Sequence, residues 1–409
     1  MTIMGYNLNV FVQVFDSTSS LQAVGVTFPP EILGRIIELT LPDPPPCDFV
    51  QLKRSPHLPR CTVKERSNER ARMLLVLSHV SRYWRAVITS HASLWSSIEA
   101  PLNHCSTGER DIVKLCAERS KDTLLRMTNF HDHDLTFLVR ESHRLVYLSL
   151  YLEPEHYTGN RMHAPQLESL LLASMDPSSF PDLPDFMQSD FPRLRRLWLQ
   201  GFTSWSKYRF SHLTHLMLSR GEATDPISMI HFLDLLRENA GLELLVLDEV
   251  YLTLDHAARP PHPVQLLRLR YLVTNNMYYD TIRNVISLVK VPPTTPARFR
   301  MRRVSWQDIT QIFSIETYPQ LILTNDTVIS IVVWQQREMS CFIYNQNYRF
   351  EISICESFGI GPGNTPLRFS LPMVDNSQIR ELSIEISSKA TGWRPLFFPF
   401  DSRSHEVDD

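Results

Sequence analysis

Glycine is scarce in this sequence, with 12 residues in 409. Glycine-rich phosphate-binding loops are therefore not expected, and the sequence contains no GxxxxGK[ST], GxGxxG, GxSxG or HExxH motif. The six cysteines are scattered and form no CxxC pair, unlike the cysteines of a small disulfide-stabilised secreted domain. We therefore expect reduced thiols in a cytoplasmic or nuclear protein.

Long hydrophobic runs are also missing. No stretch approaches the roughly 20 apolar residues that a membrane helix needs. The apolar stretch near the N-terminus has no Lys or Arg ahead of it, so we expect no signal peptide. A net charge of −3 gives no general attraction to nucleic acid or to membranes. The content of 43% hydrophobic and 21% charged residues fits a globular protein of two or three domains.

Residues 27–99 have the pattern of a small helical domain. Pro29 and Pro30 suit the first turn of a helix, where a missing N–H is harmless. Ile32, Ile36 and Leu39 follow at i, i+4 and i+7, which is typical of an apolar helix face. We expect two more short helices, in residues 70–78 and 80–88. Three helices of this length leave apolar surface uncovered, which indicates a partner or a neighbouring domain.

A proline-rich, basic insert near residues 43–68 interrupts this domain. Its prolines alternate with basic residues, namely Pro44, Pro45, Pro46, Pro56 and Pro59 with Lys53, Arg54, Arg60, Lys64 and Arg66. This composition is typical of a solvated loop. Contact with an acidic partner is the alternative. Residues 1–26 form an N-terminal segment to which we assign no function.

Three pieces of the helical domain match a known pattern. They are Phe28-Pro29-Pro30-Glu31-Ile32-Leu33, Val80-Ser81-Arg82-Tyr83-Trp84-Arg85 and Leu94-Trp95-Ser96-Ser97-Ile98. They resemble the LPPEIL, VCRxWR and LWSSI segments of the F-box proteins of basidiomycete fungi. The departures are Phe28 for the usual leucine, Ser81 for the usual cysteine, and a long spacer.

The resemblance implies a function for residues 27–99. It implies binding to the small Skp-type adaptor of a cullin–RING ubiquitin ligase. The adaptor-binding residues that it implies are Pro29, Pro30, Ile32, Leu33, Ile36, Val80, Trp84 and Trp95. For the two tryptophans, a purely structural role in the core is the alternative.

A leucine phrase, LxxLxL, recurs in the following region. It begins at Leu145, Leu167, Leu194, Leu213, Leu242 and Leu269, and in the last copy Thr274 replaces the final leucine. The spacings fall within the 20 to 29 residues of leucine-rich repeats or close to that range. Each phrase predicts a short strand whose alternating leucines point into a stacked core.

These patterns predict an α+β, or α/β solenoid, architecture. A small three-helix F-box domain would precede an irregular leucine-rich-repeat-like region in residues 100–400, with a frayed tail in residues 401–409. After about residue 281 the repeat pattern becomes irregular, and several β-rich segments follow. An α/β domain with leucine-rich strands is the alternative.

The repeat region would bind a protein target through the outward positions of its strands. We expect the target-binding residues to include Tyr147, Arg195, Trp198 and His215. Their mixed chemistry identifies no ligand.

Two further runs have the residue types of a binding site. His131-Asp132-His133-Asp134 contains metal-ligating residues without a recognisable ligand spacing, so a polar loop is the preferred interpretation. A basic cluster, made of Arg298, Arg300, Arg302 and Arg303, lacks interleaved stacking residues, so nucleic-acid binding is not expected. We expect no metal, no cofactor and no catalytic residue.

The leading hypothesis is thus a non-catalytic substrate-recognition subunit of a Skp–cullin–F-box ubiquitin ligase. Such a subunit raises the effective concentration of a target beside the ligase. The alternatives are an interaction scaffold without a ubiquitin role and an enzyme with a site that sequence motifs do not reveal.

Overall fold

The computed structural model divides the chain into two compact units, residues 1–125 and 126–409. It describes residues 28–41, 68–99, 107–131, 135–152, 162–174, 183, 191–202, 205, 210–219, 226–254, 262–292, 295–302, 327–334, 338–344, 349–355, 379–387 and 396–397. Residues 1–26, nearly all of the basic insert and residues 401–409 lie outside these ranges. Each unit is described by itself.

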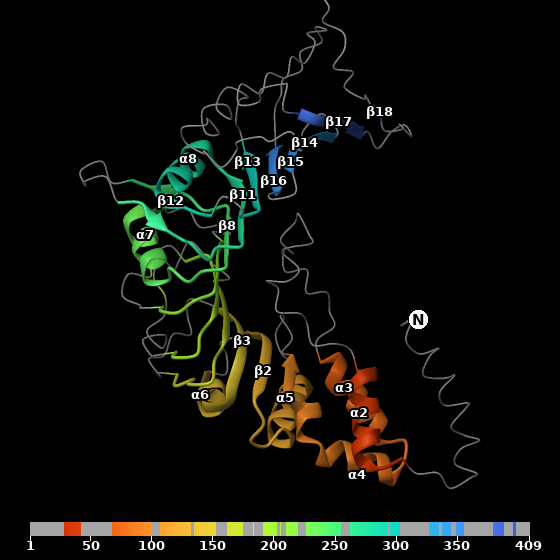
Figure 1. Ribbon diagram of the computed structural model, residues 1–409. Coiled ribbons are helices and arrows are strands. Elements are labelled where there is room, and N and C mark those ends of the chain that lie inside the picture. Colours follow the sequence, from red (N-terminus) through yellow and green to blue (C-terminus); the bar gives the residue numbers. More distant parts are fainter. Residues whose placement is uncertain are drawn as a thin grey trace, which may run out of the picture. The chain divides into compact units, whose positions relative to one another are not determined.

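The described part of unit 1 is mainly helical (Figure 1). Its elements are α2 (Pro30–Thr40), α3 (Glu69–Ser78), α4 (Arg82–Ser90), the 3-10 helix η2 (Ala92–Trp95), the strand β1 (Ser97–Glu99) and α5 (Thr107–Arg119). The helices expected from apolar periodicity are therefore confirmed, to within a few residues at each end. The Ser81 side chain caps α4 by accepting a hydrogen bond of 3.1 Å from the backbone N–H of Trp84.

Trp95 is the largest fully buried side chain in unit 1. Its indole N–H donates a hydrogen bond of 2.9 Å to the backbone carbonyl of Ile88, so its only polar atom is satisfied. The guanidinium carbon of Arg119, at the end of α5, lies 4.5 Å from the centre of its ring. Trp95 thereby links η2, α4 and α5.

Unit 2 is built on one large sheet. From β2 onward its strand order is β2-β3-β4-β5-β6-β8-β11-β13-β16-β15-β14-β17-β18. The strands of its first part are β2 (Leu125–His131), β3 (Leu145–Leu152), β4 (Ser169–Ser174), β5 (Arg196–Gln200), β6 (His215–Ser219), β8 (Leu244–Asp248), β11 (Tyr271–Met277) and β13 (Ala297–Arg302). From β3 to β13, neighbouring strands are parallel.

The last strands of the sheet follow a different order. They are β14 (Thr327–Trp334), β15 (Glu338–Tyr344), β16 (Arg349–Cys355), β17 (Ile379–Ser387) and β18 (Leu396–Phe397). The β14–β15, β15–β16 and β17–β18 pairs are antiparallel, whereas β13–β16 and β14–β17 are parallel. The sheet is therefore mixed.

Three helices of unit 2 lie in the connections between strands (Figure 1). These are α6 (Leu135–Glu141), which continues into η4 (Ser142–Arg144), α7 (Met229–Glu238) and α8 (Tyr279–Leu288). Two short parallel pairs flank α7 and α8, namely β7 (Ile227–Ser228) with β9 (Leu252–Thr253) and β10 (Val264–Gln265) with β12 (Val289–Lys290).

The leucine phrases form a buried row across the sheet. Leu148, Leu170, Leu197, Leu216, Leu245 and Leu272 are aligned across six neighbouring strands. All of them are buried. The prediction that the phrases are strands with inward leucines is therefore confirmed.

The predicted architecture of a three-helix F-box domain followed by a leucine-rich-repeat solenoid is wrong. The chain is a mixed α/β protein with a large, mostly parallel sheet, and its last strands run out of chain order. Two of the positions expected to face solvent are also covered, because Tyr147 and Trp198 are buried. Parallel sheets with both faces covered produce the same leucine pattern as a solenoid. The alternative of an α/β domain with leucine-rich strands is closer to the structure.

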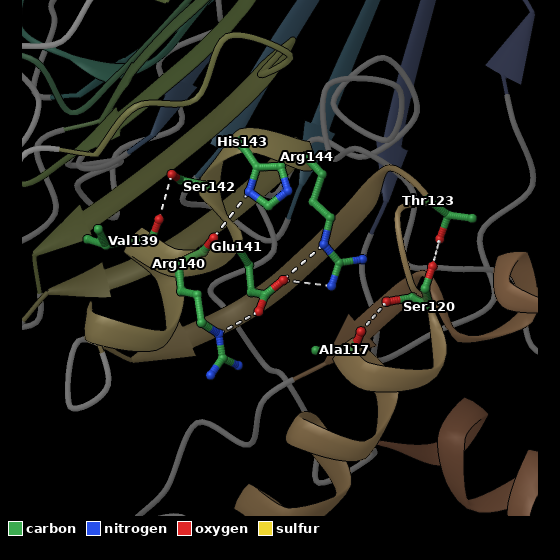
Figure 2. A network of polar contacts seen from close by, with 9 residues as sticks. All are labelled: Ala117, Ser120, Thr123, Val139, Arg140, Glu141, Ser142, His143 and Arg144. Atoms are coloured by element: carbon green, nitrogen blue, oxygen red, sulfur yellow. Dashed lines mark hydrogen bonds and ion pairs between the residues drawn. The ribbon is translucent and has the colours of Figure 1, made fainter.

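A buried ion pair fixes the turn before β3. Arg144 donates hydrogen bonds of 2.9 and 2.7 Å from Nε and Nη2 to Oε2 of Glu141, and Arg140 donates one of 2.8 Å to Oε1 (Figure 2). Burial alone would raise the pKa of Glu141, but the hydrogen bonds and charges of the two arginines outweigh it and leave the pKa below its usual value. Glu141 is therefore ionised at neutral pH.

Candidate partner-binding surface

Helix α2 carries two apolar stripes on different sides. Leu33 and Ile37 are buried and face the core of unit 1, and Leu41 continues this side beyond the helix. Ile32 is 50% exposed and Leu39 is 71% exposed, with the half-buried Ile36 between them. Since residues four and three apart lie on the same side of a helix, these three side chains form one stripe. We call Ile32, Ile36 and Leu39 the outer stripe of α2.

The start of α2 extends the outer stripe. Phe28 is exposed, and Pro29 and Pro30 beside it are exposed as well. The hydroxyl of Tyr83, in the first turn of α4, donates a hydrogen bond to the backbone carbonyl of Phe28. This bond holds the beginning of α2 against the beginning of α4.

The middle of α2 lies very close to the end of α4. A Cβ atom built on Gly34 would be 2.8 Å from the imidazole of His91, closer than two such atoms can approach. The His91 ring is held in turn by the backbone carbonyl of Val87, 2.8 Å from Nδ1. Glycine at position 34 therefore permits the close packing that fixes the direction of the outer stripe.

Few charges surround the outer stripe. Arg35 and Glu38 form an ion pair one turn apart on α2, and Glu31 is exposed in its first turn. Arg35 lies three residues after Ile32 and four before Leu39, so this ion pair borders the stripe along one edge. An apolar stripe with a polar rim is typical of a protein-binding surface.

The structure distributes the eight predicted adaptor-binding residues unevenly. Pro29, Pro30, Ile32 and Val80 are exposed, and Ile36 and Trp84 are half-buried. Leu33 and Trp95 are buried in the core. A partner docked on this unit would contact the first group, whereas Leu33 and Trp95 would act only by holding the helices in place.

Four exposed apolar residues of unit 1 were absent from the predicted set, namely Phe28, Leu39, Val76 and Leu124. Phe28 and Leu39 extend the outer stripe at both ends, and Val76 is exposed on α3. The spacing of Leu39, seven residues after Ile32, was sufficient to identify it. Val76 lies in the run from Met73 to Leu77, in which every residue is apolar, so the sequence alone does not show that Val76 faces away from the buried Leu74 and Leu77.

The predicted target-binding residues fall into two groups. Tyr147 and Trp198 are buried within the sheet, and the guanidinium of Arg126 lies 5.3 Å from the centre of the Tyr147 ring. Arg195 is exposed and donates a hydrogen bond of 3.0 Å to the backbone carbonyl of His212. His215 is half-buried, with Nδ1 2.9 Å from the hydroxyl of Thr214. Only the second pair lies within reach of a partner, at the amino ends of β5 and β6.

Unit 1 also contains a partly buried carboxylate, that of Glu99 in β1. The Glu99 carboxylate accepts a hydrogen bond from the backbone N–H of Asn68. Burial, and after it the charge of Glu69, raises the pKa of Glu99 above its usual value. The Asn68 residue itself is buried with a left-handed backbone, φ 63°.

The described residues offer no assembled metal site. No group of three or more His, Cys, Asp or Glu side chains is placed to hold an ion within the ranges given above. The 132–134 part of the histidine–aspartate run and Arg303 of the basic cluster lie outside those ranges. Burial raises the pKa of the Cys116 thiol to about 12, so this cysteine is an inert core residue.

Comparisons with known proteins identify no relative of this chain. No family model matches the chain, and neither a curated protein nor a solved structure is significantly similar to it. Among the helices that the structure describes, none has both the length and the apolar character needed to span a membrane.

Proposed function

We infer that this chain is a non-catalytic substrate-recognition subunit of a Skp–cullin–F-box ubiquitin ligase. In this proposal the outer stripe of α2 binds the Skp-type adaptor, and unit 2 binds the protein target. The chain contributes no nucleophile, and it acts by holding the target near the ligase. It would do so in the cytoplasm or the nucleus.

One observation carries the proposal. The residues on which the F-box resemblance depends include Pro29, Pro30 and Ile32, and these are exposed on a helix whose opposite side is packed into a core. Exposed apolar side chains at helical spacing are the usual anchors of helix-mediated recognition. A merely structural helix of this kind would carry polar residues on its outer side.

The test is co-purification of the full-length chain with a Skp-type adaptor. The informative variant is Ile32→Ser, with Leu124→Ser as its matched control, because both side chains are 50% exposed and both belong to unit 1. We expect Ile32→Ser to weaken adaptor binding about tenfold or more, as for a central apolar anchor. Leu124→Ser should leave binding unchanged.

Two outcomes would count against the proposal. A folded full-length chain that captures no Skp-type adaptor would favour an interaction scaffold without a ubiquitin role. Equal loss of binding in Ile32→Ser and Leu124→Ser would mean that adaptor capture depends on general apolar exposure and not on the outer stripe. Trp84→Ala should also weaken capture, through contact or through lost packing.

A further inference from the structure

Helices α2 and α4 pack against each other within unit 1 (Figure 1). Leu33 and Ile37 of α2 and Val87 and Ile88 of α4 are buried. Apolar burial is not directional, so it does not by itself fix the spacing and angle between two short helices. Contacts of another kind must set them.

Such contacts lie at both ends of α4. At its beginning, the hydroxyl of Tyr83 donates a hydrogen bond to the backbone carbonyl of Phe28, just before α2. At its end, His91 is the C-cap residue of α4, and its imidazole lies against Gly34 of α2. Because the two contacts are at opposite ends of α4, together they determine both the distance and the direction of α2.

The contact at His91 is a very close one. A Cβ atom built on Gly34 would be 2.8 Å from both Cδ2 and Nε2 of the imidazole and 3.3 Å from Cε1. Carbon atoms in ordinary contact are about 3.5–4.0 Å apart. The imidazole therefore occupies the place of a side chain at position 34, and α2 approaches this closely because residue 34 has none.

The imidazole is tied to α4. Its Nδ1 lies 2.8 Å from the carbonyl oxygen of Val87, and since a carbonyl can only accept, Nδ1 donates this hydrogen bond. The hydroxyl of Ser90 lies 3.3 Å from the same nitrogen, and the backbone N–H of His91 donates to the Val87 carbonyl at 3.1 Å. The ring is thus a rigid spacer that belongs to α4.

This spacer lies under the surface that a partner would contact. Gly34 is buried and His91 is half-buried, and Gly34 lies between Ile32 and Ile36 of the outer stripe in the sequence. The exposed Val80 precedes α4. A partner that contacts α2 and α4 together needs their side chains placed to within about 0.5 Å. The imidazole of His91 controls that placement without being part of the contact.

We propose that His91 is a positioning residue: its imidazole sets the spacing between α2 and α4, and thereby joins the outer stripe, Val80 and Trp84 into one partner-binding surface. The control of spacing stands on the contact with Gly34. The Skp-type adaptor as the partner rests on the proposed function, and the two are tested separately.

The test combines Gly34→Ala and His91→Ala in the full-length chain, singly and together. Affinity for a Skp-type adaptor is measured by calorimetric titration, below the melting temperature of every variant. We expect Gly34→Ala to weaken binding about tenfold in the parent chain and about threefold or less when His91 is also alanine, because the added methyl group then meets no ring. A purely structural role would change the fraction of folded chain but not the affinity of the folded chain.

Thermal unfolding of the same variants tests the spacing without an adaptor. Alanine in place of glycine inside a helix ordinarily stabilises it. In the parent chain the contact with His91 should reverse this effect, so Gly34→Ala should lower the melting temperature, whereas it should raise it in the His91→Ala chain. The matched control is Gly108→Ala in α5, where an added Cβ meets nothing within 4 Å. This control should leave adaptor affinity unchanged and should not lower the melting temperature.

Three outcomes would overturn the proposal. Equal weakening by Gly34→Ala with and without His91 would mean that the effect does not pass through the imidazole. A lowered melting temperature with unchanged affinity would make His91 a packing residue only. If the parent chain captures no adaptor, the proposed function fails, and the thermal measurement then decides the control of spacing, which is refuted if Gly34→Ala has the same sign in both chains.

Discussion

Unit 1 and unit 2 differ in how much apolar surface they leave uncovered. In unit 1, Phe28, Ile32, Leu39, Val76, Val80 and Leu124 are large apolar side chains exposed to solvent. In the described part of unit 2, strands β3 to β8 are buried on both faces, and the exposed large apolar side chains are Tyr251, Leu267 and Tyr278. Uncovered apolar surface is unfavourable in water and favours a partner.

The two units also differ in the surroundings of their buried carboxylates. Glu141 in unit 2 is held by two arginines, which keep its carboxylate ionised. Burial, and after it the like charge of Glu69, raises the pKa of Glu99 in unit 1. The Glu141 carboxylate of unit 2 is thus matched by cations, whereas unit 1 combines an exposed apolar surface with a carboxylate in an unfavourable environment. The following predictions test this contrast.

The largest effect is expected where a buried charge loses its partner. Arg144→Met leaves the Glu141 carboxylate without its buried partner and should lower the free energy of unfolding by about 3–5 kcal/mol. Arg140→Met removes an arginine whose side chain is 65% exposed and should cost about 1 kcal/mol or less. Urea unfolding followed by circular dichroism measures both. Equal costs would contradict the assignment of Arg144 as the dominant partner.

Two adjacent residues of α2 lie on different sides of the helix, Leu33 in the core of unit 1 and Ile32 in the outer stripe. Leu33→Ala removes a buried side chain and should cost about 2–5 kcal/mol of unfolding free energy. Ile32→Ala should change stability by about 0.5 kcal/mol at most, because half of this side chain is already in water. Thermal unfolding of the two variants gives the comparison. If Ile32→Ala proved as destabilising as Leu33→Ala, the outer stripe would be a packing surface.

Asn239 tests how completely unit 2 satisfies its buried polar groups. Its amide donates to the carbonyls of Phe210 and Leu235 at 2.6 and 2.8 Å, and it accepts from the N–H of Leu213 at 2.8 Å. Asn239→Ala leaves these three backbone groups without that partner and should lower the free energy of unfolding by about 2–3 kcal/mol. Ser287→Ala removes an exposed hydrogen bond and serves as the control, with a change within about 0.5 kcal/mol.

The elements were predictable from local pattern, because helix and strand periodicity reports which side of each segment is buried. The helix Glu69–Ser78 and the strands that begin at Leu145 and Leu244 are examples. The architecture was not predictable in the same way. A row of leucines identifies one buried face of a strand but not what covers the other face, so Tyr147 and Trp198 were assigned to solvent although they are buried.

The candidate site was predictable in part, for a similar reason. The outer stripe of α2 follows from the spacing of Ile32, Ile36 and Leu39. The edge-to-face contact of Tyr251 and Tyr278 has no such pattern, because one ring follows β8, the other follows β11, and they meet only through the register of these strands. The left-handed backbone of Glu249 and Asn276 is not marked by a glycine in the sequence.

The smallest effects, and the sharpest contrast, are expected from pH. A carboxyl whose pKa is lowered on folding, as for Glu141, stabilises the protein above the unfolded value of about 4.3, and this stability is lost as pH falls through the folded pKa. Glu99 has a raised pKa, so its contribution is greatest at low pH and is lost as pH rises from about 4.3 through the folded pKa. Acidification should therefore reduce the stabilising contribution of Glu141 in unit 2 and relieve the destabilising contribution of Glu99 in unit 1.

Glu141→Gln and Glu99→Gln isolate these two contributions. At pH 7 we expect Glu99→Gln to increase hydrogen-exchange protection of unit 1 peptides, because it removes the buried charge, and Glu141→Gln to decrease protection of unit 2 peptides. Each variant is compared with the parent chain at the same pH, so that the intrinsic exchange rate cancels. Near pH 4 both differences in hydrogen-exchange protection should become smaller. The Glu99 carboxyl of the parent chain is then largely protonated, and the Glu141 carboxylate contributes less to stability than at pH 7. A change of the same sign in both variants at pH 7 would mean that the two carboxyls have similar environments, and the contrast between the units would then rest on apolar surface alone.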